Sequence, residues 1–185
     1  YKRQELQLVV SGYILTFGLV LVPAGRLGDQ RSRRVLFLVG LSLFLVTSLA
    51  CALAPTTSVL LTARLLQGVA AGIQMPQVLG LVQQLFQGKE RGRAFGLFGA
   101  TIGIATALGP TLGGLLIALG GDTDGWRLIF WINIPLVLIV IVLAAWLLPN
   151  TRTASHRALD LDPVGVILFG PVSYTHLRAH ETPEH

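Results

Sequence analysis

Long apolar runs alternate along the chain with short polar turns. Five of the runs predict membrane-crossing helices, at residues 6–24, 35–54, 59–86, 94–119 and 128–148. The first two contain no charged residue, and about 20 residues at 1.5 Å per residue span the roughly 30 Å hydrocarbon core of a bilayer. A sixth apolar run begins at residues 163–170 and stops at Pro171. The pattern predicts an all-α membrane protein.

The composition agrees with this pattern. Hydrophobic residues make up 52% of the 185 residues and charged residues only 12%, whereas soluble domains carry about 25% charged residues. A buried helix of a large soluble protein could supply one such run, but five in series with short turns exclude that interpretation. The first run lacks a small-residue cleavage site and further spans follow it at once, so it is not a secretory signal.

Basic residues are distributed unevenly between alternate turns. The alternate set of turns holds only three basic residues, Lys2, Arg3 and Arg127. The other set holds nine of the 14 Lys and Arg residues: Arg26, Arg31, Arg33, Arg34, Lys89, Arg91, Arg93, Arg152 and Arg157. Because basic turns stay on the cytoplasmic side, we expect residues 25–34 to be cytoplasmic, in a bacterial inner membrane. The net charge of +5 is therefore a topology signal, and we expect no nucleic-acid partner.

Residues 171–185 differ sharply from the rest and resemble the translation of a sequencing-library adapter. We expect them to lie outside the native fold. They contain His176, His180 and His185, so we predict no metal site there. The single cysteine, Cys51, is expected to be a small packing residue. Tyr1 is not an initiator methionine, and we expect the chain to begin inside a longer protein.

The turn at residues 25–34 places a carboxylate, Asp29, among several arginines. Such a group suits an ion-paired latch, and glycines at 25 and 28 allow backbones to approach closely. Anchoring of helix ends to lipid headgroups is the alternative for the arginines alone.

This turn resembles the cytoplasmic loop signature of the major facilitator superfamily, G-x-L-a-D-r-x-G-r-k. The matching residues are Gly25, Leu27, Asp29, Arg33 and Arg34, while Ser32 stands where the signature has its second glycine. The resemblance implies a gating latch in which Asp29 and Arg33 stabilise one state of an alternating-access cycle.

Arg64 is a charged residue inside a predicted span, with Gln67 on the same helical face. An arginine at mid-membrane costs about 2.5–3.5 kcal/mol, so it should face a partner or a wet cavity. Snorkelling toward the turn at residues 55–58 is the alternative. With Gln67 and Gly68, Arg64 resembles the superfamily pattern l-x-x-x-R-x-x-q-G, whose arginine is implicated in proton transfer. The predicted spans contain no Asp or Glu, so we expect the carboxylate partner in a helix that precedes Tyr1.

The fourth predicted span is rich in small residues spaced by four, which permit close helix contact. Its residues resemble the antiporter signature g-x8-g-x3-G-P-x2-G-G through Gly96, Gly109, Pro110, Gly113 and Gly114, with Ala105 in place of one glycine. The resemblance implies a bend and a helix interface that limits leakage, a feature of exporters rather than uptake proteins. Simple helix packing is the alternative.

The entry to the fifth predicted span carries two tryptophans, which suit a membrane interface. The string W-R-x-i-F-x-i-N-x-P resembles the 14-helix drug:proton antiporters of the EmrB/QacA type through Trp126, Arg127, Phe130, Asn133 and Pro135.

The resemblance implies a partial N-terminal half of a major facilitator superfamily bundle. Residues 1–148 would supply helices two to six, 149–162 a cytoplasmic connection and 163–170 the start of the next helix. The implied function is proton-coupled efflux of small amphipathic or cationic molecules, driven by the proton gradient without a cofactor. A metabolite facilitator that is uncoupled or differently coupled is the alternative. An enzyme or a structural subunit has little support. We expect this segment alone to be inactive, because alternating access needs two repeats.

Overall fold

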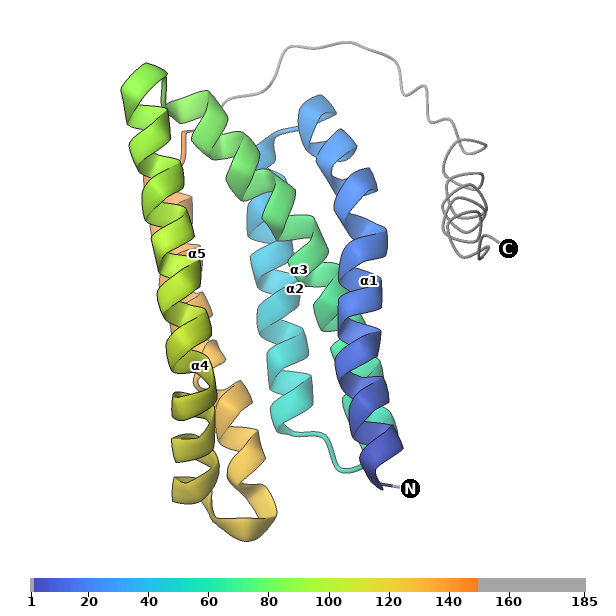
Figure 1. Cartoon of the computed structure of the whole chain (residues 1–185). Coiled ribbons are helices and arrows are strands. Elements are labelled where there is room, and N and C mark those ends of the chain that lie inside the picture. Colours follow the sequence, from blue (N-terminus) through green and yellow to red (C-terminus); the bar gives the residue numbers. More distant parts are fainter. Residues whose placement is uncertain (1, 150–185) are drawn as a thin grey trace, which may run out of the picture. The chain divides into compact units, whose positions relative to one another are not determined.

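Five helices form the part of the chain that the computed structural model describes, the backbone of residues 2–149 and the side chains of 7–121 and 125–149. They are α1 (Lys2–Gln30), α2 (Arg33–Ala52), α3 (Thr57–Leu85), α4 (Gly88–Trp131) and α5 (Asn133–Leu147). Successive helices from α1 to α4 run in alternating directions (Figure 1). Five segments are long and apolar enough to cross a membrane: Gln7–Gln30, Arg33–Ala52, Thr57–Leu85, Gly88–Gly121 and Gly125–Leu147. The prediction of five spans is confirmed.

α3 is the central helix of this group. It packs against α1 on one side and α2 on the other, whereas α1 and α2 barely touch each other. Gly68 and Gly72 of α3 lie so close to the carbonyl groups of Tyr13 and Phe17 in α1 that a Cβ atom would collide with them. Two small residues spaced by four thus let the α1 and α3 backbones meet.

The first connection is much shorter than the turn predicted at residues 25–34. α1 continues to Gln30, so only Arg31 and Ser32 separate it from α2. Gly25 and Gly28, which we predicted in the turn, are helical residues. A glycine costs a helix only about 1 kcal/mol, and at Gly28 the missing side chain leaves room for Gln77 of α3, while Gly25 makes an ordinary contact with Pro76. Close packing offsets the low helix propensity.

The fourth helix begins at Gly88, earlier than the predicted start at residue 94. Its first turns carry charged, exposed residues that the hydropathy pattern excluded from the span. Arg91 donates hydrogen bonds from Nε to the carbonyl of Phe86 (3.0 Å) and from Nη2 to that of Gln83 (2.9 Å). These bonds satisfy carbonyls at the end of α3, where intrahelical partners run out.

A break at Gly121 divides α4 into two arms. Gly121 has φ 79° and ψ 172°, a backbone conformation that is essentially restricted to glycine. The backbone of Gly125 then lies against Ile117, where a Cβ atom would not fit. The two predicted spans at 94–119 and 128–148 are therefore the two arms of a tight hairpin, the second arm continuing into α5.

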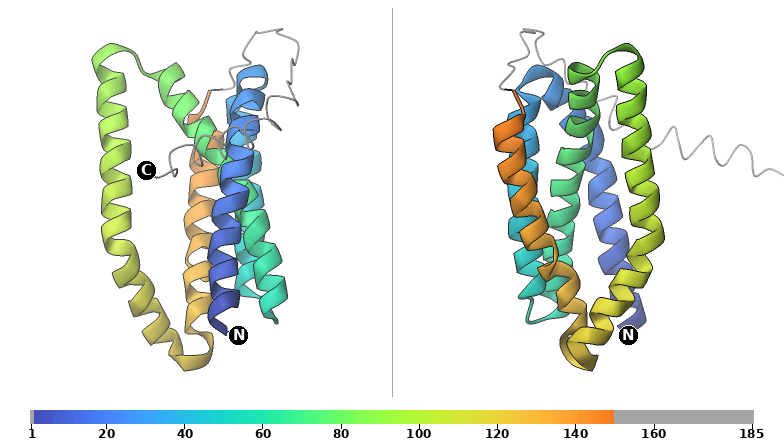
Figure 2. Two further views of the ribbon diagram at one scale, coloured as in Figure 1. Left: turned by 45° about the vertical axis from the view of Figure 1, so that its right-hand side comes forward. Right: turned by 90° about the vertical axis from the view of Figure 1, so that its left-hand side faces the viewer.

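The first arm of α4 is the least covered segment of the described residues. None of the residues in its most apolar 18-residue window is buried. Figure 2 shows this arm running along one side of the group formed by the other helices.

Candidate functional site

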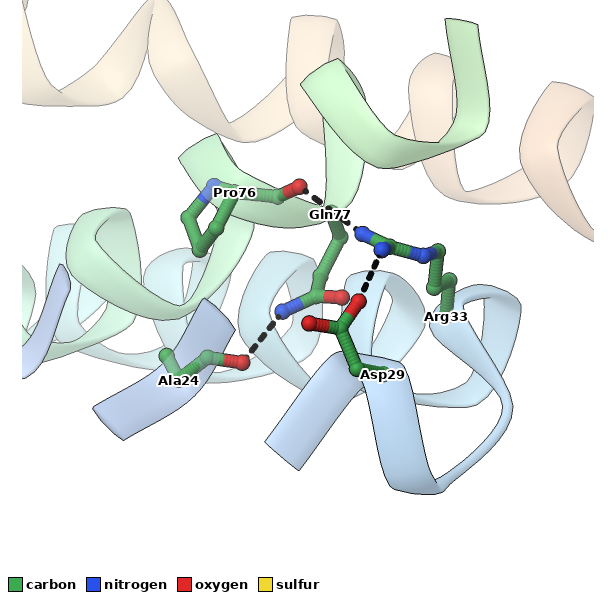
Figure 3. Close-up of polar contacts among 5 residues, drawn as sticks. All are labelled: Ala24, Asp29, Arg33, Pro76 and Gln77. Atoms are coloured by element: carbon green, nitrogen blue, oxygen red, sulfur yellow. Dashed lines mark hydrogen bonds and ion pairs between the residues drawn. The ribbon is translucent and has the colours of Figure 1, made fainter. Parts of the chain in front are cut away.

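Two polar clusters contain predicted site residues, Asp29 and Arg33 in one and Arg64, Gln67 and Phe130 in the other. The first, which we call the Arg33 cluster (Ala24, Asp29, Arg33, Pro76 and Gln77), lies where α1 ends and α2 begins (Figure 3). Arg33 forms an ion pair with Asp29 across the short connection, and its Nη1 donates to the Pro76 carbonyl of α3 at 3.3 Å. The Arg33 side chain is 15% exposed and that of Asp29 65% exposed. The arginine therefore ties α3 to the junction of α1 and α2, while the carboxylate faces outward.

α3 supplies two residues of this region that the sequence analysis missed. Gln77 is fully buried, and its Nε2 donates to the Ala24 carbonyl at 2.9 Å. Gly80 leaves the space in which the Arg33 guanidinium lies. A signal for Gln77 was present, because Gln67, Gln74 and Gln77 are polar residues on one face of α3.

The remaining predicted latch residues lie at the same end of the helices. Arg34 donates from Nη2 to the Ala145 carbonyl near the end of α5, at 2.5 Å. Gly25 lies beside the Pro76 ring, and Leu27 contributes its carbonyl to a bond from the Arg31 N–H. The structure thus pairs Asp29 with Arg33 and brings Arg33 and Arg34 onto carbonyl groups of α3 and α5. Their gating role remains a prediction.

The second cluster, the Arg64 cluster, lies inside the spans and contains Tyr13, Ser48, Arg64, Gln67 and Phe130. Arg64 donates from Nη1 to Oε1 of Gln67 at 3.1 Å, and Gln67 donates from Nε2 to Oγ of Ser48 in α2 at 2.7 Å. Gln67 and Ser48 are 1% and 0% exposed. The guanidinium is therefore bound to a protein partner, as the spacing of Arg64 and Gln67 predicts.

Two aromatic rings face the same guanidinium. Its central carbon lies 4.8 Å from the ring centre of Phe130 and 5.5 Å from that of Tyr13. Such cation–π contacts contribute about 0.5–2 kcal/mol each, depending on desolvation. In the described part of the chain, the buried Nε atom of Arg64 has no hydrogen-bond partner. The cluster joins α1, α2, α3 and the start of the fifth span around one positive charge.

Gly68, predicted with Arg64 and Gln67, has a different environment. It lies on the Tyr13 carbonyl at the contact between α1 and α3. Packing alone explains a glycine at this position.

The predicted motif at 126–135 is divided between two places. Arg127 donates from Nη1 to the Ala52 carbonyl and from Nη2 to the Ala54 carbonyl, each at 2.9 Å, so it caps the end of α2. Trp126 stacks under this guanidinium at 4.9 Å and contacts Phe130 edge-on. Asn133 and Pro135 lie in the first turn of α5, where a missing N–H costs no helical hydrogen bond.

The predicted antiporter motif lies on the first arm of α4. A Cβ atom built at Gly96, Gly109, Gly113 or Gly114 would meet nothing within 4 Å among the described residues. Pro110 is inside the helix, and the non-helical backbone of α4 lies at Gly121 instead. The structure brings none of these residues into either cluster.

Comparisons with known proteins identify the family of this chain. A family model described as Major Facilitator Superfamily matches residues 1–180. The chain is 40% identical over 165 residues to the Multidrug resistance protein Stp of Mycobacterium tuberculosis, covering 89% of this chain and 30% of Stp. It is 38% identical to the Probable actinorhodin transporter of Streptomyces coelicolor, with 89% and 28% covered. It is 34% identical to the Tetracenomycin C resistance and export protein of Streptomyces glaucescens, with 89% and 30% covered.

The chain thus spans less than a third of the length of these curated relatives. The family match extends over almost all of the sequence, including all five membrane-length helices. This multi-pass membrane chain therefore belongs to the major facilitator superfamily of transporters.

Proposed function

We propose that the whole protein containing this chain exports small amphipathic or cationic molecules in exchange for protons, by alternating access. The names of the relatives, which include a multidrug resistance protein and a tetracenomycin C resistance and export protein, support the substrate class. The Arg64 cluster carries the proposal. Ionisable residues inside membrane spans are rare and mark ion or proton pathways, because they are costly to bury without a function.

Within this mechanism Arg64 supplies a fixed positive charge inside the spans. Its guanidinium would stabilise the negative charge of a nearby carboxylate. The partner carboxylate would lie in a part of the whole protein outside this chain. The Arg33 cluster would act at the helix ends, where making and breaking the contacts of Arg33 would favour one state of the cycle.

Reconstitution of the full-length protein tests this proposal. Proteoliposomes with an internal pH dye receive an imposed pH gradient, and the transport of ethidium, an amphipathic cation, is followed by fluorescence. We expect ethidium transport driven by the gradient and a matching proton flux. Arg64→Ala should abolish both, whereas Arg26→Ala, at an exposed arginine outside both clusters, should leave them unchanged. Transport indifferent to the gradient would contradict proton coupling.

A metabolite facilitator without proton coupling is the second candidate. Accumulation rather than exclusion of a substrate by cells that express the full-length protein would support it. The resemblance of residues 96–114 to the antiporter signature favours export.

A further inference from the structure

We propose that Ser48 is a positioning residue for Arg64. Its hydroxyl fixes the amide of Gln67, and Gln67 in turn holds the guanidinium against Tyr13 and Phe130. The inference rests on the proposed function, in which Arg64 takes part in proton coupling.

The chemistry of the amide makes Ser48 necessary. A glutamine side chain has one acceptor end and one donor end, whereas an arginine side chain only donates. Gln67 must therefore present Oε1 to Arg64, as it does at 3.1 Å, and its Nε2 then needs an acceptor. Ser48 Oγ provides this acceptor at 2.7 Å in a site where both residues are almost completely buried.

Loss of the Ser48 hydroxyl would leave the Gln67 amide nitrogen buried without a partner. An unsatisfied buried donor costs about 1–3 kcal/mol, so the amide would turn toward another acceptor. Rotation of the amide would withdraw Oε1 from Arg64. Ser48 thus acts on the charged group through Gln67, to which both residues are hydrogen-bonded.

Arg64 depends on this bond because little else fixes its direction. In the described part of the chain its guanidinium makes one hydrogen bond, to Gln67, and its Nε is unpartnered. The two rings attract the positive charge but do not select which N–H group points where. Gln67 therefore decides which face of the guanidinium remains available to a further partner.

The neighbouring residue Thr47 provides a matched control. Thr47 is also buried in α2, at 3% exposure, but its hydroxyl donates within its own helix, to the carbonyls of Leu43 and Phe44. Thr47→Val removes this hydroxyl and keeps the shape of the side chain. Cys51, which is fully buried one turn from Ser48 and belongs to the same buried apolar cluster as Phe130, reports on local packing.

The test uses the full-length protein, with any cysteine other than Cys51 replaced. Ethidium efflux and ethidium-driven proton release are measured between pH 6 and pH 8.5. This is roughly the range in which coupled carboxyls and histidines titrate at functional sites. Labelling of Cys51 by N-ethylmaleimide is measured in parallel. We expect Ser48→Ala to lower proton release several-fold and to shift the pH midpoint of efflux. Ser48→Thr, which retains a hydroxyl, should keep the parent's midpoint, as should Thr47→Val. Labelling of Cys51 should remain slow in all variants.

Each contrary result has a distinct meaning. If Ser48→Ala behaves like Thr47→Val while Arg64→Ala is inactive, Ser48 does not position Arg64 but the proposed function stands. If Arg64→Ala retains proton-coupled efflux, the role proposed for Arg64 is wrong and the positioning role of Ser48 falls with it, whereas efflux by the parent that is indifferent to the pH gradient would overturn the proposed function itself. If Ser48→Ala makes Cys51 react rapidly, the hydroxyl maintains packing only, and the inference is overturned.

Discussion

The guanidinium of Arg33 lies directly against Gly80, in the space that a side chain at position 80 would fill. Arg33 reaches α3 across the ends of α1 and α2, and its bond to the Pro76 carbonyl requires this space. The Arg33 cluster therefore depends on a small residue in α3 that contributes no side chain of its own.

Substitution Gly80→Ala is predicted to expel Arg33 without unfolding the helices. The added Cβ meets the mobile end of the arginine rather than backbone, so the arginine can move aside. We expect Gly80→Ala to reduce efflux by the full-length protein as much as Arg33→Ala does. The double variant should be no worse than either single variant, because both remove one interaction. Additive losses would contradict this prediction, and Gly92→Ala, in open space, is the control.

Substitution Gly68→Ala is predicted to lower the stability of the contact between α1 and α3. Here the added Cβ meets the Tyr13 carbonyl, which is backbone and cannot rotate away. Overpacking of this kind costs about 1–3 kcal/mol. Thermal unfolding of the purified protein in detergent measures the effect. Gly18→Ala in α1 has nothing within 4 Å and should leave the unfolding midpoint unchanged or raise it. Equal midpoints for both variants would show that the close contact does not form.

Substitution Arg127→Lys is predicted to weaken the cap on α2 despite keeping the positive charge. The guanidinium spans two carbonyls, those of Ala52 and Ala54, and a single ammonium group does not reproduce this geometry. A hydrogen bond from a charged donor contributes about 1.5–3 kcal/mol, so we expect a loss of that order in the free energy of unfolding. The same measurement on Arg26→Lys provides the control. A midpoint equal to that of the parent would mean that charge alone suffices.

Two substitutions at Gln77 are predicted to differ. Gln77→Met removes a buried amide whose Oε1 has no partner in the described residues. The Ala24 carbonyl lies within helix α1 and keeps its helical bond, so we expect little loss of stability. Gln77→Glu buries a carboxylate that cannot donate to Ala24, and we expect a clearly lower unfolding midpoint and yield. The opposite order would mean that the Gln77 hydrogen bond matters more than the burial of its oxygen.

The number and order of the spans could be predicted from the sequence, because bilayer thickness imposes a length on every apolar run. The extent of the first turn could not. The polar, basic string at residues 25–34 indicated a turn between two apolar runs, but α1 continues through Gly25 and Gly28, and Gln77 of α3 lies in the space beside Gly28. Hydropathy is a local property, whereas this contact depends on residues about 50 positions away along the chain, as the pairing of Ala24 with Gln77 illustrates.

The sequence indicated Arg64 and Gln67 together because residues three positions apart are neighbours on a helix face. It did not indicate Ser48, which comes from another helix, and a serine in an apolar span carries no distinctive pattern. The function of Gly80 was equally hidden, since an empty position is recognised only when its neighbour is in place. In the Arg64 cluster, short-range partners were predictable and partners across helices were not.

The position of α3 between α1 and α2 constrains the order of assembly in the membrane. The first two helices are joined by Arg31 and Ser32 and enter the bilayer as a hairpin, yet they have few contacts with each other. Their glycines at 12 and 40 are fitted to residues of α3. We expect the hairpin to remain loosely associated until the ribosome has delivered α3, which then binds both arms at once. The residues that hold this part of the transporter together are thus translated last among the three helices. A substitution that disrupts α3 would leave α1 and α2 inserted in the membrane without the helix that packs against both.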